Sequence, residues 1–168
     1  VNLPYVDQPR GQILQTYLAW RMLNLSRVHG RSVDMVIPTK WPSYAVSHPN
    51  KVVWLVHQHR QAYELYRTRY SDMHARPDGW FFAWLVRRLD KLALSEARRL
   101  YSISATTADR LWRYNNLEAT PVYPPSPLAG RIRPGEYGDY LLAPGRMEPI
   151  KRFDLMIRYD ALARPATW

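Results

Sequence analysis

Apolar positions along this chain follow two patterns, one with helical spacing and one in short continuous runs. Apolar residues three or four positions apart predict helices over 12–28 and 80–99. Continuous β-branched runs predict strands at 33–37 and, most clearly, at 51–57. The other predicted elements are an irregular loop at 61–77, a strand at 100–103, a helix that follows Ser104 and ends near 115–116, a strand at 139–143 and a helix at 152–163. Because strands alternate with helices, we predict an α/β fold with a mostly parallel sheet.

A proline-rich segment interrupts this alternation. The prolines of Pro121–Pro127 favour a stiff, extended connector. We therefore expect an α/β unit at 1–120, a linker at 121–138 and the start of a second unit at 139–168. One strand and one helix cannot close a core, so the second unit is expected to be incomplete.

The helix predicted at 80–99 is amphipathic. Its apolar face consists of Phe82, Leu85, Val86, Leu89, Leu92 and Ala93, and its opposite face of Trp84, Arg87, Arg88, Lys91, Ser95 and Arg98. Glu96 lies on the apolar side, where we expect it to cap or to pair. The basic face fits three environments: solvent, an anionic bilayer or nucleic acid.

The charge balance favours anionic partners. The chain carries 24 Lys and Arg against 14 Asp and Glu, a formal net charge of +10. This charge suits nucleic acid, phosphorylated ligands or an anionic membrane face. The absence of cysteine excludes disulfides, thiolate nucleophiles and cysteine metal sites. No apolar run approaches the ~20 residues of a membrane span. The chain begins without Met, so we expect it to be an excerpt of a longer protein.

A glycine, an arginine and a lysine follow the apolar run at 140–143. Gly145 opens a turn, Arg146 offers a planar fork of donors, and Lys151 adds a mobile point charge. A strand that leads into a helix N-terminus is where open α/β folds bind phosphate, so the two cations are candidates to hold a diphosphate. The alternative is a pair of solvated charges beside a helix start.

A second candidate site follows the strand predicted at 51–57. His57, His59 and Arg60 come at its exit. On an extended chain the two histidines would share one side, which suits a hydrogen bond to a ligand or a metal pair. No carboxylate or cysteine lies close by in the sequence to complete a metal shell, so we expect no metal. The alternative role is a histidine satisfied at a sheet edge. Arg60 fits an acceptor phosphate or a pair with Glu64 one turn later.

Several segments, taken in order, resemble glycosyltransferase family 4, the retaining nucleotide-sugar enzymes of GT-B fold. Gly145–Arg152 resembles the family signature Gly-Arg-Leu-x-x-x-Lys-Gly/Arg, and Val122–Pro125 resembles the Tyr-Pro-Pro before its interdomain linker. Ser102–Ser104 resembles a strand end that precedes a helix in the family. The family spacing also recurs at Asp90, Ala93, Leu94, Ala97 and Arg98.

This resemblance implies Rossmann-like parallel sheets with flanking helices, incomplete at both ends. Residues 1–120 would be part of the N-terminal, acceptor-side domain, and 139–168 would begin the donor-binding domain. Gly145, Arg146 and Lys151 would bind the donor diphosphate. His57 or His59 would face the transferred sugar as the catalytic histidine, and Arg60 would contact the acceptor.

The activity implied is hexosyl transfer with retention, in the synthesis of cell-envelope glycans, other polysaccharides or glycolipids. The donor is a nucleotide-diphosphate sugar, the acceptor a glycan, a lipid-linked or a small molecule, and neither a cofactor nor a metal is needed. The implied location is the cytoplasm, with peripheral contact to an anionic membrane at its inner face and no nucleic acid partner. The family's Gly-rich loop is not found and its two-glutamate motif would lie beyond Trp168, so the chain alone is expected to be inactive.

Two alternatives come from other functional classes. A basic, aromatic-rich module could bind single-stranded nucleic acid by stacking, although the charge is spread along the chain and no known nucleic-acid motif is present. A GT-B-like domain could also bind its ligand without catalysis, because a fold does not determine chemistry.

Overall fold

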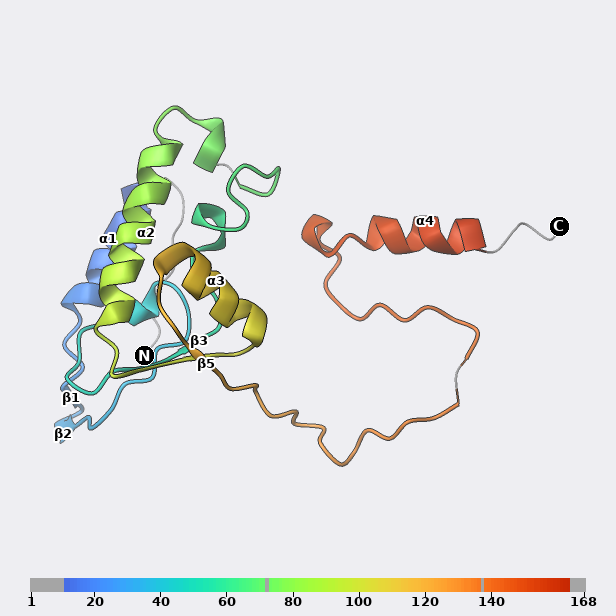
Figure 1. The fold of residues 1–168 in the computed structure, drawn as a ribbon. Helices are drawn as coiled ribbons and strands as arrows, with labels where there is room; N and C mark the ends of the chain where they lie inside the picture. The colour runs from blue at the N-terminus through green and yellow to red at the C-terminus, as the bar shows by residue number, and fades with distance from the viewer. Residues whose placement is uncertain (1–10, 72, 137, 164–168) are drawn as a thin grey trace. The chain divides into compact units, whose positions relative to one another are not determined.

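The chain forms two compact units, Val1–Pro125 and Ser126–Trp168, called unit 1 and unit 2 below (Figure 1). The computed structural model describes residues 11–71, 73–136 and 138–163. The division between the units falls inside the segment predicted as a linker. The strands of the described residues all belong to unit 1.

A parallel sheet lies in unit 1. Its strands are β3 (Val52–Leu55), β4 (Arg99–Ser102) and β5 (Thr120–Pro121), in the order β3-β4-β5. β3 and β4 pair along their whole length, with Leu55 opposite Ser102. The strands predicted at these two places are confirmed, and so is the mixed α/β class with a parallel sheet.

The segment 36–40 runs parallel to β3 on its outer side. Val36 pairs with Lys51, and the N–H of Trp54 donates to the carbonyl of Pro38 at 3.1 Å. Pro38 has no N–H of its own to return a bond, so it interrupts the ladder. The predicted strand in this segment is therefore reduced to isolated bridges.

Three helices pack around the core of unit 1: α1 (Gly11–Met22), α2 (Gly79–Ser95) and α3 (Ala105–Asn115). α2 connects β3 to β4 and α3 connects β4 to β5, as the crossovers of a parallel sheet must. α1 lies beside α2, where the Tyr17 hydroxyl donates to the carbonyl of Leu89 at 2.8 Å (Figure 1). None of the helices in the described part of the chain has both the length and the apolar character of a membrane span.

The first helix is shorter than the helix predicted over 12–28. It ends at Met22 and is followed by a hairpin of β1 (Arg27–Val28) and β2 (Arg31–Ser32). The turn residues His29 and Gly30 have φ angles of 50° and 77°, as a two-residue hairpin turn requires. The prediction was wrong here because apolar residues at helical spacing continue past Met22, whereas the helical backbone ends there.

The irregular loop predicted at 61–77 is confirmed. The described residues of this loop form two short 3₁₀ turns, η2 (Arg60–Ala62) and η3 (Met73–Ala75), and a third, η1 (Ser43–Ala45), precedes β3. By contrast, α3 has sharp boundaries. The Ser104 hydroxyl accepts the N–H of Thr107 at 3.2 Å, and Asn116 ends the helix with φ 53°. Both predicted ends of this helix are confirmed.

Glu96 joins α1, α2 and the start of β3. Its carboxylate accepts two bonds from Arg21, at 2.6 and 2.7 Å, and one from Lys51 Nζ at 3.0 Å. Partial burial alone would raise the pKa of Glu96, but the bonds from the two cations outweigh it and lower that pKa. The expectation that Glu96 pairs is confirmed.

Arg87 departs from the predicted basic face of α2. Its Nε donates to the carbonyl of Ala62 at 2.6 Å, so the side chain is turned toward the rest of unit 1. The guanidinium also lies within 5.7 Å of three ring centroids, those of Tyr63, Tyr66 and Tyr114. Arg87 therefore serves packing rather than the outer surface.

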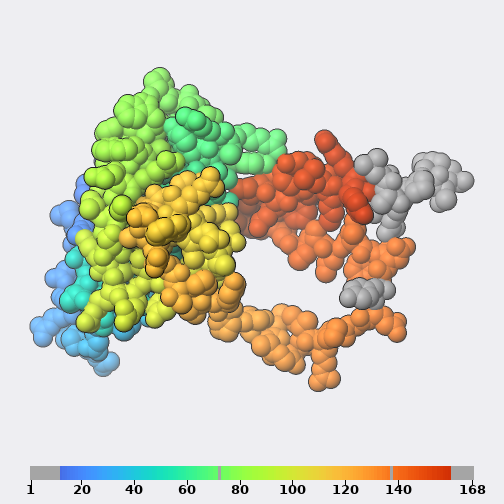
Figure 2. Space-filling view, in the orientation of Figure 1, coloured from blue at the N-terminus to red at the C-terminus, as the bar shows by residue number. Residues whose placement is uncertain are grey.

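Unit 2 contains η4 (Pro149–Lys151) and α4 (Phe153–Ala163). The helix predicted at 152–163 is confirmed, whereas the strand predicted at 139–143 is wrong: this segment is extended and bent, without a strand partner. A strand needs a neighbour for its hydrogen bonds, while a helix makes its own, and the described residues of unit 2 supply no second strand. Residues 127–131, orange in Figure 2, form hydrogen-bonded turns: the N–H of Ala129 donates to the carbonyl of Ser126 at 3.1 Å, and that of Arg131 to the carbonyl of Leu128 at 2.9 Å.

Candidate functional site

A pocket of about 350 Å³ lies at the carboxyl end of β3. This β3 pocket is lined by Trp20, Lys40, Trp41, Pro42, Ser43, His57, Gln58, His59, Arg60 and Gln61. Trp20 comes from α1, and the other lining residues come from two segments that lie side by side because Lys40 pairs in parallel with His57 just beyond the end of β3. Ligands of open parallel sheets bind at this end of the strands.

The two predicted histidines both line the β3 pocket but differ in exposure. His57 is exposed, and its Nδ1 lies 2.8 Å from the carbonyl oxygen of Gln58. His59 is buried and its ring stacks on Trp41 with centroids 4.6 Å apart. β3 ends at Leu55, so strand alternation does not extend to these residues. Of the pair, His57 is the one that can reach a ligand, and His59 is part of the pocket wall.

Arg60 and Lys40 give the β3 pocket its positive charge. Arg60 Nε donates to Glu64 at 2.6 Å, so the predicted alternative of an i,i+4 pair is the one that forms. Glu64 also lies 3.4 Å from Arg110 and is therefore shared between two cations. Lys40 is exposed at the pocket rim. The pocket accordingly suits a polar or anionic ligand.

A buried polar network lies behind the pocket. The hydroxyl of Tyr63 donates to Asp90 Oδ2 at 2.8 Å, and Asn115 Nδ2 donates to that hydroxyl at 3.3 Å. Gln58 Nε2 in turn donates to Asn115 Oδ1. These four residues connect α2 and α3 to the loop that carries His57, and so hold its backbone in place.

Asp90 is fully buried in this network. Burial raises the pKa of its carboxyl to about 7, while hydrogen bonds from Tyr63, Tyr44 and Trp41 act in the opposite direction. The sequence signal for this site is weak, because only the spacing of Asp90 along the helix points to it. An aspartate four residues after Val86 and three before Ala93, both on the buried side of α2, could have indicated it.

The Asp90→Asn variant should change how stability depends on pH. The unfolded chain releases this proton near pH 3.8, whereas the folded state keeps it to about pH 7. Wild-type stability from this group is therefore complete at low pH and falls as pH rises through that window. Asparagine cannot ionise, so the variant should gain stability relative to the wild type between about pH 5 and about pH 8. Urea unfolding at about pH 5 and about pH 8 measures this difference in stability. The control is the exposed Asp109→Asn variant, whose stability should depend on pH as that of the wild type does.

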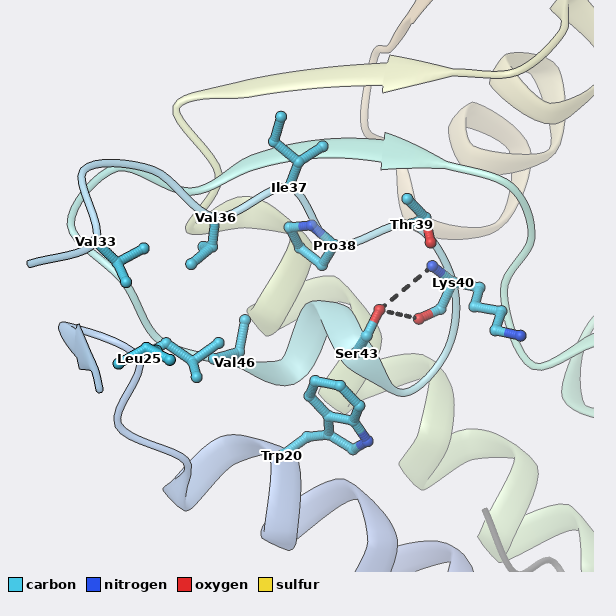
Figure 3. A pocket seen from close by; sticks show the side chains of 11 residues that line it. Trp20, Leu25, Val33, Val36, Ile37, Pro38, Thr39, Lys40, Ser43 and Val46 are labelled. Atoms are coloured by element: carbon cyan, nitrogen blue, oxygen red, sulfur yellow. Dashed lines mark hydrogen bonds between the residues drawn. The ribbon is translucent and has the colours of Figure 1, made fainter. Parts of the chain in front are cut away.

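A second, apolar pocket of about 360 Å³ adjoins the first (Figure 3). It shares Trp20, Lys40 and Ser43 with the β3 pocket. The Ser43 hydroxyl donates to the carbonyl of Lys40 at 2.7 Å and so fixes the corner between the two pockets. Its remaining lining is Leu25, Val28, Val33, Val36, Ile37, Pro38, Thr39 and Val46. The sequence does not predict this pocket, because its walls come from separate segments.

The cations predicted to bind diphosphate lie together in unit 2, in the segment 145–152, called the Arg146 turn below. Gly145 packs closely on Phe153, since an added Cβ would lie 3.3 Å from its ring. The Arg146 side chain is 81% exposed and pairs with Glu148 at 3.2 Å. Lys151 is exposed at the end of η4, one residue before Arg152 with φ 54°. The expected buried strand before this turn is absent. The turn is held by backbone hydrogen bonds within residues 146–152 and by the packing of Gly145 on Phe153.

The structure therefore gathers His57, His59 and Arg60 in unit 1 and Gly145, Arg146 and Lys151 in unit 2. Among residues 11–71, 73–136 and 138–163, no three His, Asp or Glu side chains lie close enough together to hold a metal ion. Comparison with protein-family models, with curated proteins and with solved structures finds no match.

Proposed function

We propose that this chain is part of a retaining glycosyltransferase of GT-B type, which moves a sugar from a nucleotide-diphosphate donor to an acceptor. The observation that carries the proposal is the Arg146 turn. It keeps a guanidinium and an ammonium exposed in one short turn directly before α4, with the family signature at the same residues. The β3 pocket supports it as a site for the sugar and acceptor.

In this proposal Arg146 and Lys151 bind the donor diphosphate. As the bond between the anomeric carbon and the phosphate oxygen breaks, negative charge grows on that oxygen, and fixed cations stabilise it most at that moment. The acceptor hydroxyl forms the new bond on the face from which the phosphate departs. Its proton passes to the departing phosphate oxygen. Two cations supply the charge that a metal would otherwise provide, so the proposal needs none.

His57 is the pocket residue proposed to contact the transferred sugar. It is exposed, and its Nδ1 contact with Gln58 orients the ring so that Nε2 points away from that carbonyl. His59 is proposed as a positioning residue, since it is buried against Trp41. Arg60 remains able to meet an acceptor because its side chain is 42% exposed despite the pair with Glu64.

The exposed apolar residues of unit 2 fit the same proposal. Leu142 and Met147 are 77% and 80% exposed, and none of residues 126–136 and 138–159 is buried. Further strands and helices of a donor-binding domain would cover them. The family resemblance further implies that the surrounding reading frame encodes a Gly-rich turn upstream and a two-glutamate motif downstream.

The decisive experiment is a donor screen on the polypeptide encoded by that whole reading frame. Saturation-transfer NMR with uridine, guanosine and adenosine diphosphate sugars should reveal binding of at least one, and the product should keep the donor's anomeric configuration. The matching nucleoside monophosphates, which lack the diphosphate, are the control and should bind more weakly. Binding of single-stranded RNA with a steep salt dependence, and of no nucleotide sugar, would replace the proposal with the nucleic-acid module.

A further inference from the structure

The first turns of α2 expose three large aromatic side chains. Trp80, Phe81 and Trp84 are 65%, 43% and 51% exposed. They contact one another: the rings of Trp80 and Phe81 lie 6.1 Å apart edge to face, and those of Phe81 and Trp84 are stacked at 6.0 Å. These three residues are the aromatic cluster. A contiguous exposed apolar patch of this kind marks an interaction surface.

The aromatic cluster is not needed to hold α2 in unit 1. The buried side of the helix is formed by Ala83, Val86, Ala93 and Leu94, all at most 2% exposed, and by Asp90. Arg87 adds its contacts with the tyrosines on that same inner side. The aromatic residues on the opposite side lie outside this buried face, and their exposure points to a partner.

Cations accompany the aromatic cluster. Arg88 and Lys91 are exposed on the next turns of α2, and Arg76 is exposed just before the helix. Neither Arg88 nor Lys91 forms an ion pair with a described residue. The only acidic residue between 79 and 95 is the buried Asp90. The exposed side of α2 thus carries the aromatic cluster on its first turns and two cations, Arg88 and Lys91, on the turns that follow.

The aromatic cluster lies toward the same end of the sheet as the β3 pocket. Glu96, just after α2, bonds to Lys51 at the start of β3, while Arg87 bonds to Ala62 beyond the end of β3. Moving from Glu96 to Arg87 therefore follows β3 from its amino to its carboxyl end. Residues 80–84 continue in that direction, on the part of α2 drawn farthest from the strands (Figure 1).

We propose that the aromatic cluster, with Arg76, Arg88 and Lys91, docks this chain onto the surface of an anionic lipid bilayer. Trp and Phe partition into the membrane interface, and basic residues beside them bind anionic headgroups. Single-stranded nucleic acid fits less well, because Phe81 and Trp84 stack on each other, which covers one face of each ring that a base would otherwise use. The docking does not depend on the proposed sugar transfer, and it would place the β3 pocket on the membrane-facing end of unit 1.

Flotation of the 168-residue chain with lipid vesicles tests the proposal. Binding is expected to vesicles that contain phosphatidylglycerol, with a blue shift of tryptophan fluorescence, and to be weaker with phosphatidylcholine alone. The triple variant Trp80→Ser, Phe81→Ser, Trp84→Ser should bind roughly a hundredfold more weakly. Arg88→Gln with Lys91→Gln should lower binding and flatten its salt dependence.

The matched control is Trp112→Ser, on α3 outside the aromatic cluster and 53% exposed, which should bind as the wild type does. Circular dichroism checks that each variant is folded, and the single variant Trp84→Ser replaces the triple variant if that one is not. The proposal is overturned if the cluster variants bind vesicles as tightly as the wild type or if the wild type binds neither vesicle. It is equally overturned if the same substitutions abolish binding of single-stranded RNA or a dimer of this chain instead.

Discussion

Replacing Lys51 with alanine is expected to cost about 3–5 kcal/mol of unfolding free energy. Lys51 is fully buried, and its Nζ donates to the carbonyls of Ala93, Val46 and Tyr44 at 2.8, 3.0 and 3.2 Å. It also bonds to Glu96 at 3.0 Å. Burial lowers the pKa of Lys51, and the pair with Glu96 opposes that shift. The variant would leave three buried carbonyls and a carboxylate without this donor.

Urea unfolding followed by tryptophan fluorescence measures this cost. The matched control is Lys91→Ala, an exposed lysine on α2, which should change stability by about 0.5 kcal/mol or less. Lys51→Met separates packing from hydrogen bonding, because methionine fills the space but cannot donate to the carbonyls. We expect it to recover only part of the loss. If both Lys51 variants stay within about 1 kcal/mol of the wild type, the bonds do not stabilise the fold as argued.

Where the signal is local, the sequence predicts this fold well. The apolar, β-branched run predicted as a strand at 51–57 forms β3 over Val52–Leu55. Ser104 caps the first turn of α3, and Asn116 ends this helix in a left-handed conformation. The prediction fails where a tertiary partner decides. The apolar run at 139–143 has strand character but no neighbour to pair with, and the segment at 36–40 loses a ladder bond at Pro38.

The candidate site is predictable in part for a similar reason. His57 and Arg60 could be identified because they follow a strand directly, and parallel sheets bind ligands at that end. The other wall of the β3 pocket could not, because Lys40 and Trp41 reach it only through pairing of 36–40 beside β3. The Asp90 network is not predictable from the sequence, since its hydrogen bonds join residues from three separate segments, the loop after β3, α2 and α3.

Arg146→Ala, made in the polypeptide encoded by the whole reading frame, is expected to lower kcat for sugar transfer by about 10²–10³. If Arg146 stabilises the departing diphosphate, its loss removes an interaction that is strongest in the transition state, so kcat falls more than KM changes. Arg146→Lys should recover only part of the activity, because an ammonium lacks the planar fork. The matched control is Arg133→Ala, an exposed arginine of unit 2 outside the Arg146 turn, which should leave kcat unchanged.

The double variant Arg146→Ala, Lys151→Ala distinguishes a shared site from two independent charges. If both cations hold one diphosphate, the combined loss should be smaller than the product of the single losses, because the second substitution acts on a site already disrupted. Both side chains are exposed and the nearest ion pair is between Arg146 and Glu148, so neither substitution should reduce the unfolding free energy by more than about 0.5 kcal/mol. Wild-type kcat in Arg146→Ala would remove Arg146 from the donor site. A fall in kcat accompanied by an equal loss of stability would instead assign it a role in folding.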